Sequence, residues 1–520
     1  MRRVSIGFCA VALLALAGCS DRLALPVSPA DAPRHSVGAL PALGQTYVIL
    51  GRGGALPNGL AADVARAGGS MISILNEVGV AFAQSSSPDF RSRVARLRGV
   101  ESVTPDLMVT RTPPVSIRRE IPDEIPASAA GLETAVASIG DDETFFSFQW
   151  APAAVQAPEA WTAGFTGKGV RVAILDGAIH SAHLDLAPNL DVAASRSFVA
   201  GFDFNQDIGS FWHGTHVAGI VAAADNGFGT IGIAPGATLI GIKVIHGQTG
   251  SFLSLLQGLL YAATSLAEGG AGAHVVNMSL ALTIDEKNRA IKADVRELAR
   301  VTDRVTTYAH RRGVTLVAAA GNDTTDYDLE NTLLLLPAMS QHVISVGATG
   351  PHGWALGATD FARPTYYTNF GKALVDLSAP GGTVGLFAVD GVDEICAVQG
   401  TFATVVTFCE VFDTILSTVR GGPTSTSSYN WAQGTSMAAP VVAGIAALVI
   451  ERNGGSMHPA QVAAALQQGA IDHGEPGNDP FHGKGWVNAF RSVQAMRADA
   501  VASLERIDGS QSFQGAMQRR

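Results

Sequence analysis

Three polar residues lie in short stretches of small residues, in the chain order aspartate, histidine, serine. Asp176 follows the apolar run Val170–Leu175, His213 begins the stretch His-Gly-Thr-His-Val-Ala-Gly, and Ser436 lies within Gly-Thr-Ser-Met-Ala-Ala-Pro. A serine hydroxyl is a poor nucleophile unless a histidine takes its proton, and the imidazolium that forms needs a buried carboxylate beside it. The sequence therefore predicts acyl transfer, with Ser436 as nucleophile, His213 as general base and Asp176 as the orienting carboxylate.

A fourth polar group, the side-chain amide of Asn322, follows Gly321 at the end of an apolar run. A tetrahedral intermediate needs hydrogen-bond donors for its negatively charged oxygen. We expect Asn322 and the backbone N–H of Ser436, at the start of a helix, to be these donors. Singly, such residues are common in turns, cores and helix caps, but their joint order and their neighbours favour catalysis.

An alternation of two kinds of segment predicts the scaffold that holds these residues. Apolar runs typical of buried strands are expected at Val170–Leu175, Ala237–Val244, His274–Met278, Val314–Ala320 and Val343–Val346. Between them, helical segments are expected at Ser254–Leu266 and Glu286–Arg312. This alternation favours an α/β fold with a parallel sheet. The apolar run Val441–Ile450 is too short to cross a bilayer and predicts a buried helix behind the nucleophile.

The region from about residue 149 to 497 resembles the catalytic domain of the subtilisin-like (subtilase) serine peptidases. The stretches around His213 and Ser436 match the family motifs at nearly every position, whereas Asp176 is followed by Gly177 and Ala178 instead of Thr-Gly or Ser-Gly. The resemblance implies a three-layer α/β fold with a mostly parallel central sheet. It also implies substrate-binding residues at Ser279, Leu280, Ala281 and Gly321. Ala281 replaces the usual glycine, so we expect a narrower pocket for the P1 side chain.

The same resemblance implies a structural calcium ion, because hard oxygen ligands gather in one loop and one preceding residue. The expected ligands are the carboxylate of Asp185, the amide of Asn226 and the carbonyl groups of Ala224, Phe228 and Thr230. The N-terminal glutamine ligand of the family has no clear counterpart, since Gln149 is shifted along the chain. A plain turn rich in Asp, Asn and Gly is the alternative.

The first residues resemble a bacterial lipoprotein signal peptide over positions 1–18. Two arginines precede the apolar stretch Val4–Leu16, and Leu-Ala-Gly precedes Cys19. The resemblance implies a lipid on Cys19 that anchors the chain to a membrane of the cell envelope. Ser20, where aspartate would retain the protein at the inner membrane, makes the outer membrane a plausible destination. An ordinary secretory signal is the alternative.

Two further cysteines, Cys396 and Cys409, remain once the signal peptide and Cys19 are set aside. An isolated pair in an exported chain favours a disulfide, which would stabilise by about 3 kcal/mol for a loop of this size. Metal binding by two cysteines alone is the alternative. Both lie in Gly381–Asn430, a segment longer than the resemblance implies, so the bridge is expected to brace a surface insertion.

A separate βαββαβ pattern occupies residues 45–111, after a proline-rich tether at 19–44. The strands are expected at Tyr47–Leu50, Met71–Leu75, Val80–Ala83 and Ser102–Val109, and the helices at Leu56–Ala67 and Asp89–Leu97. This small α+β, ferredoxin-like domain resembles the inhibitor-type propeptide of subtilases, which implies that it blocks the cleft until the chain is cut within the linker 112–148. An independent α+β domain is the alternative. Whether the cut enzyme then leaves the membrane stays open.

Composition agrees with a secreted enzyme of more than one domain. The chain has 520 residues, 47% of them hydrophobic, and a net charge of −10, so nucleic acid is not an expected partner. We expect an exported, self-processing serine endopeptidase that acts as a monomer on protein or peptide substrates, with its own propeptide as inhibitor. A catalytically silent binding protein and an acyl-transferring peptide ligase are the alternatives. The tail 498–520 has no assigned role.

Overall fold

The structure is a computed structural model that describes residues 46–106, 108–110, 115–121, 142–285, 292–330, 332–400, 404–421 and 427–495. The predicted signal peptide, Cys19, the tether 19–44 and the tail 498–520 lie outside these residues. So do positions 286–291 of the predicted helix Glu286–Arg312 and most of the predicted processing linker.

A parallel sheet forms the centre of the larger domain, with seven strands in the described part of the chain, in the order β16-β15-β13-β11-β7-β9-β8. Every neighbouring pair in it runs parallel. The strands are β7 (Arg171–Asp176), β8 (Arg196–Ser197), β9 (Thr238–Lys243), β11 (Val275–Met278), β13 (Thr315–Ala319), β15 (Val343–Thr349) and β16 (Leu377–Pro380). Nearly all their residues are buried, because both faces are covered, and this is why they read as continuous apolar runs.

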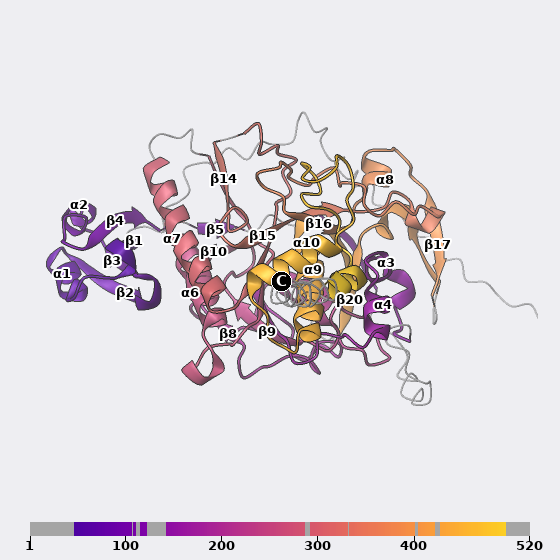
Figure 1. The fold of residues 1–520 in the computed structure, drawn as a ribbon, viewed down its shortest axis with the longest axis horizontal. Helices are drawn as coiled ribbons and strands as arrows, with labels where there is room; N and C mark the ends of the chain where they lie inside the picture. Colours follow the sequence, from indigo (N-terminus) through magenta and orange to yellow (C-terminus); the bar gives the residue numbers. More distant parts are fainter. Residues whose placement is uncertain are drawn as a thin grey trace, which may run out of the picture. The chain divides into compact units, whose positions relative to one another are not determined.

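Helices cover both faces of this sheet (Figure 1). Along β7, Val172 and Ile174 belong to one core, with side chains of α5 (His213–Ala222), α9 (Thr435–Arg452) and α10 (Pro459–Gly469). Ala173 and Leu175 belong to the other, with side chains of α6 (Phe252–Ala263) and α7 (Lys292–Arg311). The predicted three-layer α/β fold is therefore confirmed.

The helix behind the nucleophile, α9, begins six residues before the predicted run Val441–Ile450. In the described part of the chain it is the one helix long and apolar enough to cross a membrane by length and composition, but 89% of its apolar window is buried within the protein. It is a core helix. Helix α6, on the other face of the sheet, begins two residues earlier than predicted, because the Ser251 side chain caps it by accepting the N–H of Ser254.

The smaller N-terminal domain has an antiparallel sheet in the order β2-β3-β1-β4, with two helices on one face. Its elements are β1 (Thr46–Gly51), α1 (Leu60–Arg66), β2 (Gly69–Leu75), β3 (Val80–Ser85), α2 (Phe90–Val94) and β4 (Val100–Pro105). The predicted strand Ser102–Val109 is shorter in the structure: β4 ends at Pro105, and the N–H of the buried Asp106 makes a last hydrogen bond to the Thr46 carbonyl. Residues 108–110 form a separate strand, β5.

Several short strands form small antiparallel sheets outside the two main sheets. Strand β5 (Met108–Thr110) pairs with β10 (Thr249–Ser251), and β6 (Val115–Ile121) joins β19 (Ile415–Val419) and β20 (Ser428–Gln433) through β20. Strand β12 (Leu282–Asp285) pairs with β14 (Leu333–Leu336). Three further helices are α3 (Trp150–Ala154), α4 (Ala157–Thr162) and α8 (Gly385–Ala388).

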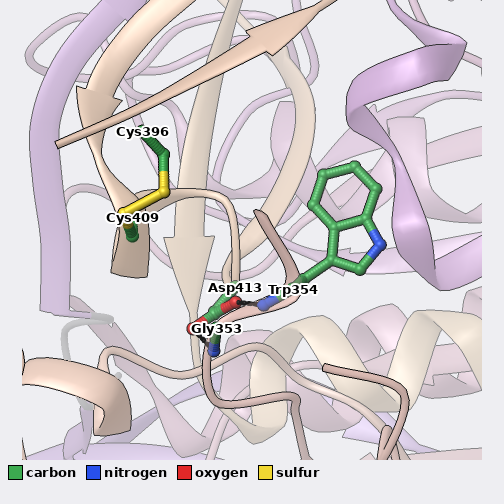
Figure 2. Close-up of a disulfide and its surroundings, with 5 residues drawn as sticks. All are labelled: Gly353, Trp354, Cys396, Cys409 and Asp413. Carbon is green, nitrogen blue, oxygen red and sulfur yellow. Dashed lines mark hydrogen bonds between the residues drawn. A yellow bond between two sulfur atoms is a disulfide. The ribbon is translucent and has the colours of Figure 1, made fainter. Parts of the chain in front are cut away.

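The insertion between β16 and β20 contains the hairpin β17 (Ile395–Gln399) and β18 (Thr404–Phe408). Cys396 and Cys409 form a disulfide across the base of this hairpin, with their Cα atoms 4.9 Å apart (Figure 2). Nearby, the buried Asp413 carboxylate accepts the N–H groups of Gly353 at 2.7 Å and Trp354 at 2.6 Å. Burial raises the pKa of Asp413 to about 7. These contacts tie the insertion to the main domain.

Candidate active site

Asp176 and His213 are in direct contact at the carboxyl end of the central sheet. Asp176 is the last residue of β7 and His213 the first of α5. The imidazole Nδ1 lies 2.8 Å from one carboxylate oxygen and 3.0 Å from the other. Because a carboxylate can only accept, the hydrogen is on Nδ1 and the lone pair is on Nε2. This is the tautomer that a general base needs.

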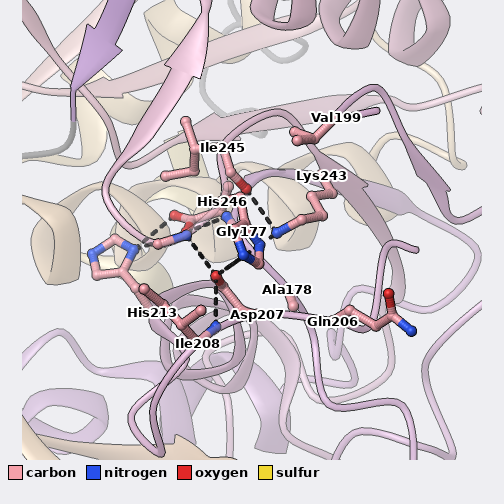
Figure 3. A network of polar contacts seen from close by, with 12 residues as sticks. Gly177, Ala178, Val199, Gln206, Asp207, Ile208, His213, Lys243, Ile245 and His246 are labelled. Carbon is pink, nitrogen blue, oxygen red and sulfur yellow. Dashed lines mark hydrogen bonds and ion pairs between the residues drawn. The ribbon is translucent and has the colours of Figure 1, made fainter. Parts of the chain in front are cut away.

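The space beside Gly177 is taken by the side chain of Asp207. The N–H of Gly177 donates to the Asp176 carboxylate at 2.6 Å. A Cβ at position 177 would lie 2.3 Å from an oxygen of the Asp207 carboxylate, beside which Gly177 lies (Figure 3). A threonine or serine at this position would therefore require the Asp207 carboxylate to move.

The other residues of the histidine motif hold α5 in place. The Thr215 hydroxyl donates to the Ala178 carbonyl at 3.1 Å and accepts the N–H of His180 at 3.0 Å. The His216 ring donates from Nε2 to the Asn430 carbonyl at 3.0 Å, and burial lowers the pKa of His216 to about 3. His216 is therefore neutral and structural, which leaves His213 as the candidate base of the two histidines in the motif.

Ser436 is the second residue of α9, and a proline four positions later shapes its surroundings. Pro440 has no N–H, so the Ser436 carbonyl lacks its usual helical donor. The hydroxyl of Ser279 donates to that carbonyl instead, at 2.8 Å, and accepts from the Asn277 amide at 2.9 Å. The Ser436 hydroxyl has a long contact of 3.4 Å to the Ser279 carbonyl. Ser279 thus holds the start of α9 against the end of β11.

Asn322 is oriented by the residue that precedes the serine. Its side-chain oxygen accepts both the N–H and the hydroxyl of Thr435, each at 2.9 Å. The amide oxygen is therefore occupied, and the donor face of the amide is turned away from Thr435. The N–H of Ser436 belongs to the first turn of α9, where backbone donors have no partner within the helix. Both groups are suited to stabilising an oxyanion.

Gly321 is required by the geometry of this turn. Its φ is +90°, and a Cβ there would lie 2.4 Å from the side-chain nitrogen of Asn369. Its N–H donates to the Thr435 hydroxyl at 3.0 Å. The other expected substrate-binding residues, Leu280 and Ala281, are largely buried, with Ala281 8% exposed. Asp176 ends β7, and Ser279 and Asn322 follow the neighbouring strands β11 and β13, so the three residues lie at one edge of the sheet.

The expected calcium ligands lie in one loop, and part of the set fits an ion. Asp185 is buried, and one carboxylate oxygen accepts the N–H of Thr230 at 2.8 Å and its hydroxyl at 3.2 Å. Its other oxygen has no hydrogen-bond partner in the described part of the chain. Among the same residues, the carbonyl groups of Ala224, Phe228 and Thr230 accept no backbone hydrogen bond, which leaves them available as ligands. The Asn226 side-chain oxygen, by contrast, accepts the Phe228 N–H.

A second group of acidic residues beside this loop was not predicted. Ligand oxygens of Asp142, Glu143 and Asp225 all lie within 4.8 Å of one another. Glu143 is fully buried; one oxygen accepts the N–H groups of Asn226 and Gly227, and the other has no donor in the residues described. Burial and the charge of Asp225 raise the pKa of Glu143 to about 8. The acidic run before Phe145 was the sequence signal that could have indicated this cluster. Gln149, the shifted glutamine, forms two hydrogen bonds with the backbone of Ile231.

Comparison with known proteins places this geometry in a family. The sequence model described as the Subtilase family matches residues 167–486. Subtilisin Savinase from Lederbergia lenta is 32% identical over 344 residues, which cover 66% of this chain and 97% of that protein. M-protease from Shouchella clausii (strain KSM-K16) is also 32% identical over 344 residues, covering 66% of this chain and 69% of its own.

Solved structures show the same fold. Fervidolysin from Fervidobacterium pennivorans, a keratinolytic enzyme related to subtilisin, matches with a TM-score of 0.62 at 21% identity, covering 86% of this chain and 61% of that one. The epidermin leader peptide processing serine protease from Staphylococcus aureus matches with a TM-score of 0.62 at 20% identity, covering 86% and 97%. The chain belongs to the subtilase family and is a subtilisin-like serine endopeptidase.

Proposed function

We propose that Ser436, His213 and Asp176 hydrolyse peptide bonds through an acyl-enzyme, with Asn322 and the Ser436 N–H as oxyanion donors. The observation that carries this assignment is the contact of 2.8 Å between the Asp176 carboxylate and Nδ1 of His213. It puts the basic lone pair on Nε2, as proton transfer from a serine requires.

Formation of the acyl-enzyme needs two proton transfers on one imidazole, and its hydrolysis needs two more. As the Ser436 oxygen attacks the substrate carbonyl, His213 takes the hydroxyl proton, and Asp176 stabilises the imidazolium. Asn322 and the Ser436 N–H stabilise the oxyanion of the tetrahedral intermediate. His213 then gives the proton to the leaving amine. Water, activated by the same imidazole, hydrolyses the acyl-enzyme and regenerates the serine.

We expect Asn322→Ala to lower kcat by about 10²- to 10³-fold with little change in KM. The amide contributes to the oxyanion, which exists only after attack, so ground-state binding is not affected. Steady-state hydrolysis of a peptide anilide measures both constants. Because Thr435 donates two hydrogen bonds to Asn322, the variant also needs a thermal unfolding control. An equal loss of kcat and rise of KM, or no change, would contradict the assignment.

The P1 pocket is expected to disfavour large aromatic side chains, because the methyl group of Ala281 lies where the family usually has glycine. Digestion of a denatured protein mixture, followed by mass spectrometry of the new termini, would show internal cleavage and the P1 distribution together. Small and aliphatic residues should dominate at P1. A P1 distribution dominated by Phe and Tyr would refute this prediction. In the Ala281→Gly variant, the fraction of cleavages after Phe and Tyr should rise.

We also propose that the N-terminal domain is an inhibitory propeptide removed by the enzyme itself. The contacts of the chain that follows it support this: β5 adds antiparallel to β10, and β6 adds antiparallel to β20, the strand just before Ser436. Strand addition is how peptidases of this kind bind extended substrates. The side chain of Arg304 on α7 also binds the Gly51 carbonyl at 2.6 Å and the Glu101 carboxylate at 2.5 Å.

Export would follow from the N-terminal segment, and we propose that Cys19 carries the lipid that anchors the precursor. Cleavage in the linker 112–148 would separate the catalytic domain from that anchor. Intact-mass measurement of membrane and soluble fractions would show a lipid adduct on the precursor and a free mature chain. An unmodified precursor would exclude the lipoprotein proposal and leave the ordinary secretory signal.

Calcium is proposed as a structural cofactor at the loop 224–230, where Asp185 with the loop carbonyl groups, and Glu143 with Asp142 and Asp225, offer two neighbouring sets of oxygen ligands. The ion would neutralise the buried carboxylates and hold the segment before α3 against the loop. We expect chelation to lower the midpoint of thermal unfolding by about 5 °C, and calcium at about 100 times its Kd to restore it.

Glu143→Gln is the variant that tests the site, and its readout is the shift that calcium produces in the unfolding midpoint. The shift should shrink in this variant and persist in Glu475→Gln, an exposed glutamate paired with Lys372. Magnesium should give a smaller shift, because it requires a tighter octahedral site. Equal midpoints in calcium and in chelator would favour a plain hydrogen-bonded turn.

A further inference from the structure

A lysine is buried directly beside the triad aspartate. Lys243 ends β9, and its Cα is paired with that of Asp176 in the parallel ladder of β7 and β9. Its side chain is fully buried, and the ammonium group donates to the Ile245 carbonyl at 2.8 Å. The next two residues donate their N–H groups to the Asp176 carbonyl. The end of β9 therefore fixes the backbone of Asp176 and brings a cation next to it.

The counter-ion of this lysine is Asp207, from the loop before α5. Its carboxylate lies 3.9 Å from the Lys243 ammonium and accepts the N–H groups of Ile208 at 3.0 Å and Gly247 at 2.6 Å (Figure 3). The same carboxylate occupies the space that a side chain at position 177 would need. Asp207 thus contacts the lysine on one side and the turn after Asp176 on the other.

Groups of opposite charge therefore gather beside the base: the Asp207 carboxylate faces the Lys243 ammonium, and Asp176, which contacts His213, is the cross-strand neighbour of Lys243. Burial lowers the pKa of Lys243, while the charges of Asp207 and Asp176 raise it. A buried charge without a partner is strongly destabilising, so the lysine and Asp207 depend on each other. The other titratable groups around this set are His246, 3.4 Å from Asp207 and stacked on Phe202, and the neutral His216.

We propose that Lys243 and Asp207 are positioning residues for the triad: together they hold Asp176 in place and balance the charge that His213 experiences. The inference rests on the proposed function, because it needs His213 as the base. Without the lysine, two carboxylates would favour the protonated imidazole, and the enzyme would require a higher pH to work. Without the Asp207 charge, the lysine would favour the neutral imidazole, and the enzyme would work at a lower pH.

The test is the acid limb of the pH profile of kcat/KM for the full chain and three variants. We expect Lys243→Met to move its midpoint upward and Asp207→Asn to move it downward, each by about half to one pH unit. The double variant Lys243→Met/Asp207→Asn, which is neutral as a pair, should return the midpoint close to that of the wild type. A structural role alone would lower kcat at every pH and would not shift the midpoint in opposite directions.

Gln206→Glu is the matched control, because it adds a charge next to Asp207 on an exposed side chain directed away from the lysine (Figure 3). The midpoint of this variant should stay at the wild-type value in 0.15 M salt, because the salt screens exposed charges over a Debye length of about 8 Å. If Lys243→Met does not fold, the midpoints of Asp207→Asn and of the double variant still test the inference. Midpoints that do not move, or that move in the same direction in both single variants, would overturn the inference. A wild type with no acid limb would instead refute His213 as the base.

Discussion

Replacing Ser436 by alanine should lower kcat for peptide hydrolysis by about 10⁶-fold and stop removal of the N-terminal domain. The hydroxyl is the only group in the proposed mechanism that forms a bond to the substrate, so no other residue can take its place. Hydrolysis of a fluorogenic peptide measures the first effect. Intact mass of the chain over time measures the second.

The fold should not depend on this hydroxyl, since its contact with the Ser279 carbonyl is long, at 3.4 Å. The unfolding midpoint of Ser436→Ala should therefore equal that of the wild type within about 2 °C. Residual activity above about one per cent of wild type, in protein free of contaminating peptidase, would assign the reaction to another nucleophile.

Asp176→Asn should lower kcat by about 10⁴-fold with the fold intact. The asparagine amide can donate to Nδ1 of His213, which would put the imidazole hydrogen on Nε2 and remove the base from the reaction. The change keeps size and shape, so the loss arises from the tautomer and from the missing negative charge. Single-turnover rates at saturating substrate, measured for variant and wild type, would give the size of the effect.

Asp203→Asn is the matched control for this variant, because it makes the same chemical change at an exposed residue of the loop before α5. Its kcat should match the wild type. If Asp176→Asn retained more than about a tenth of the wild-type kcat, the carboxylate would have no role in orienting His213.

Much of the site could be predicted because it is encoded in contiguous stretches. His213 and Ser436 lie in motifs whose neighbours also have local roles: Thr215 ties the start of α5 to the turn after Asp176, and Pro440 leaves the Ser436 carbonyl to Ser279. The buried strands were predicted to within one or two residues at most ends, since apolar runs covered on both faces have a strong pattern.

The remaining features depend on residues far apart in the sequence. Gly177 lies against the side chain of Asp207, 30 positions later, and no local pattern connects the two. Glu143 meets Asp225 across 82 positions, so their acidic cluster became visible only in the folded chain. Strand β5 likewise pairs with β10, far along the chain, and not with the sheet that contains β4. Pairings of this kind are set by tertiary packing.

The central claim is that Ser436 is a nucleophile activated by His213, and covalent labelling tests it most directly. A fluorophosphonate reagent should modify the folded chain once, and peptide mapping by mass spectrometry should locate the adduct on Ser436, with activity lost in proportion. The His213→Ala variant should react far more slowly. An adduct on any other residue that accompanies the loss of activity, or equally fast labelling of His213→Ala, would contradict the account.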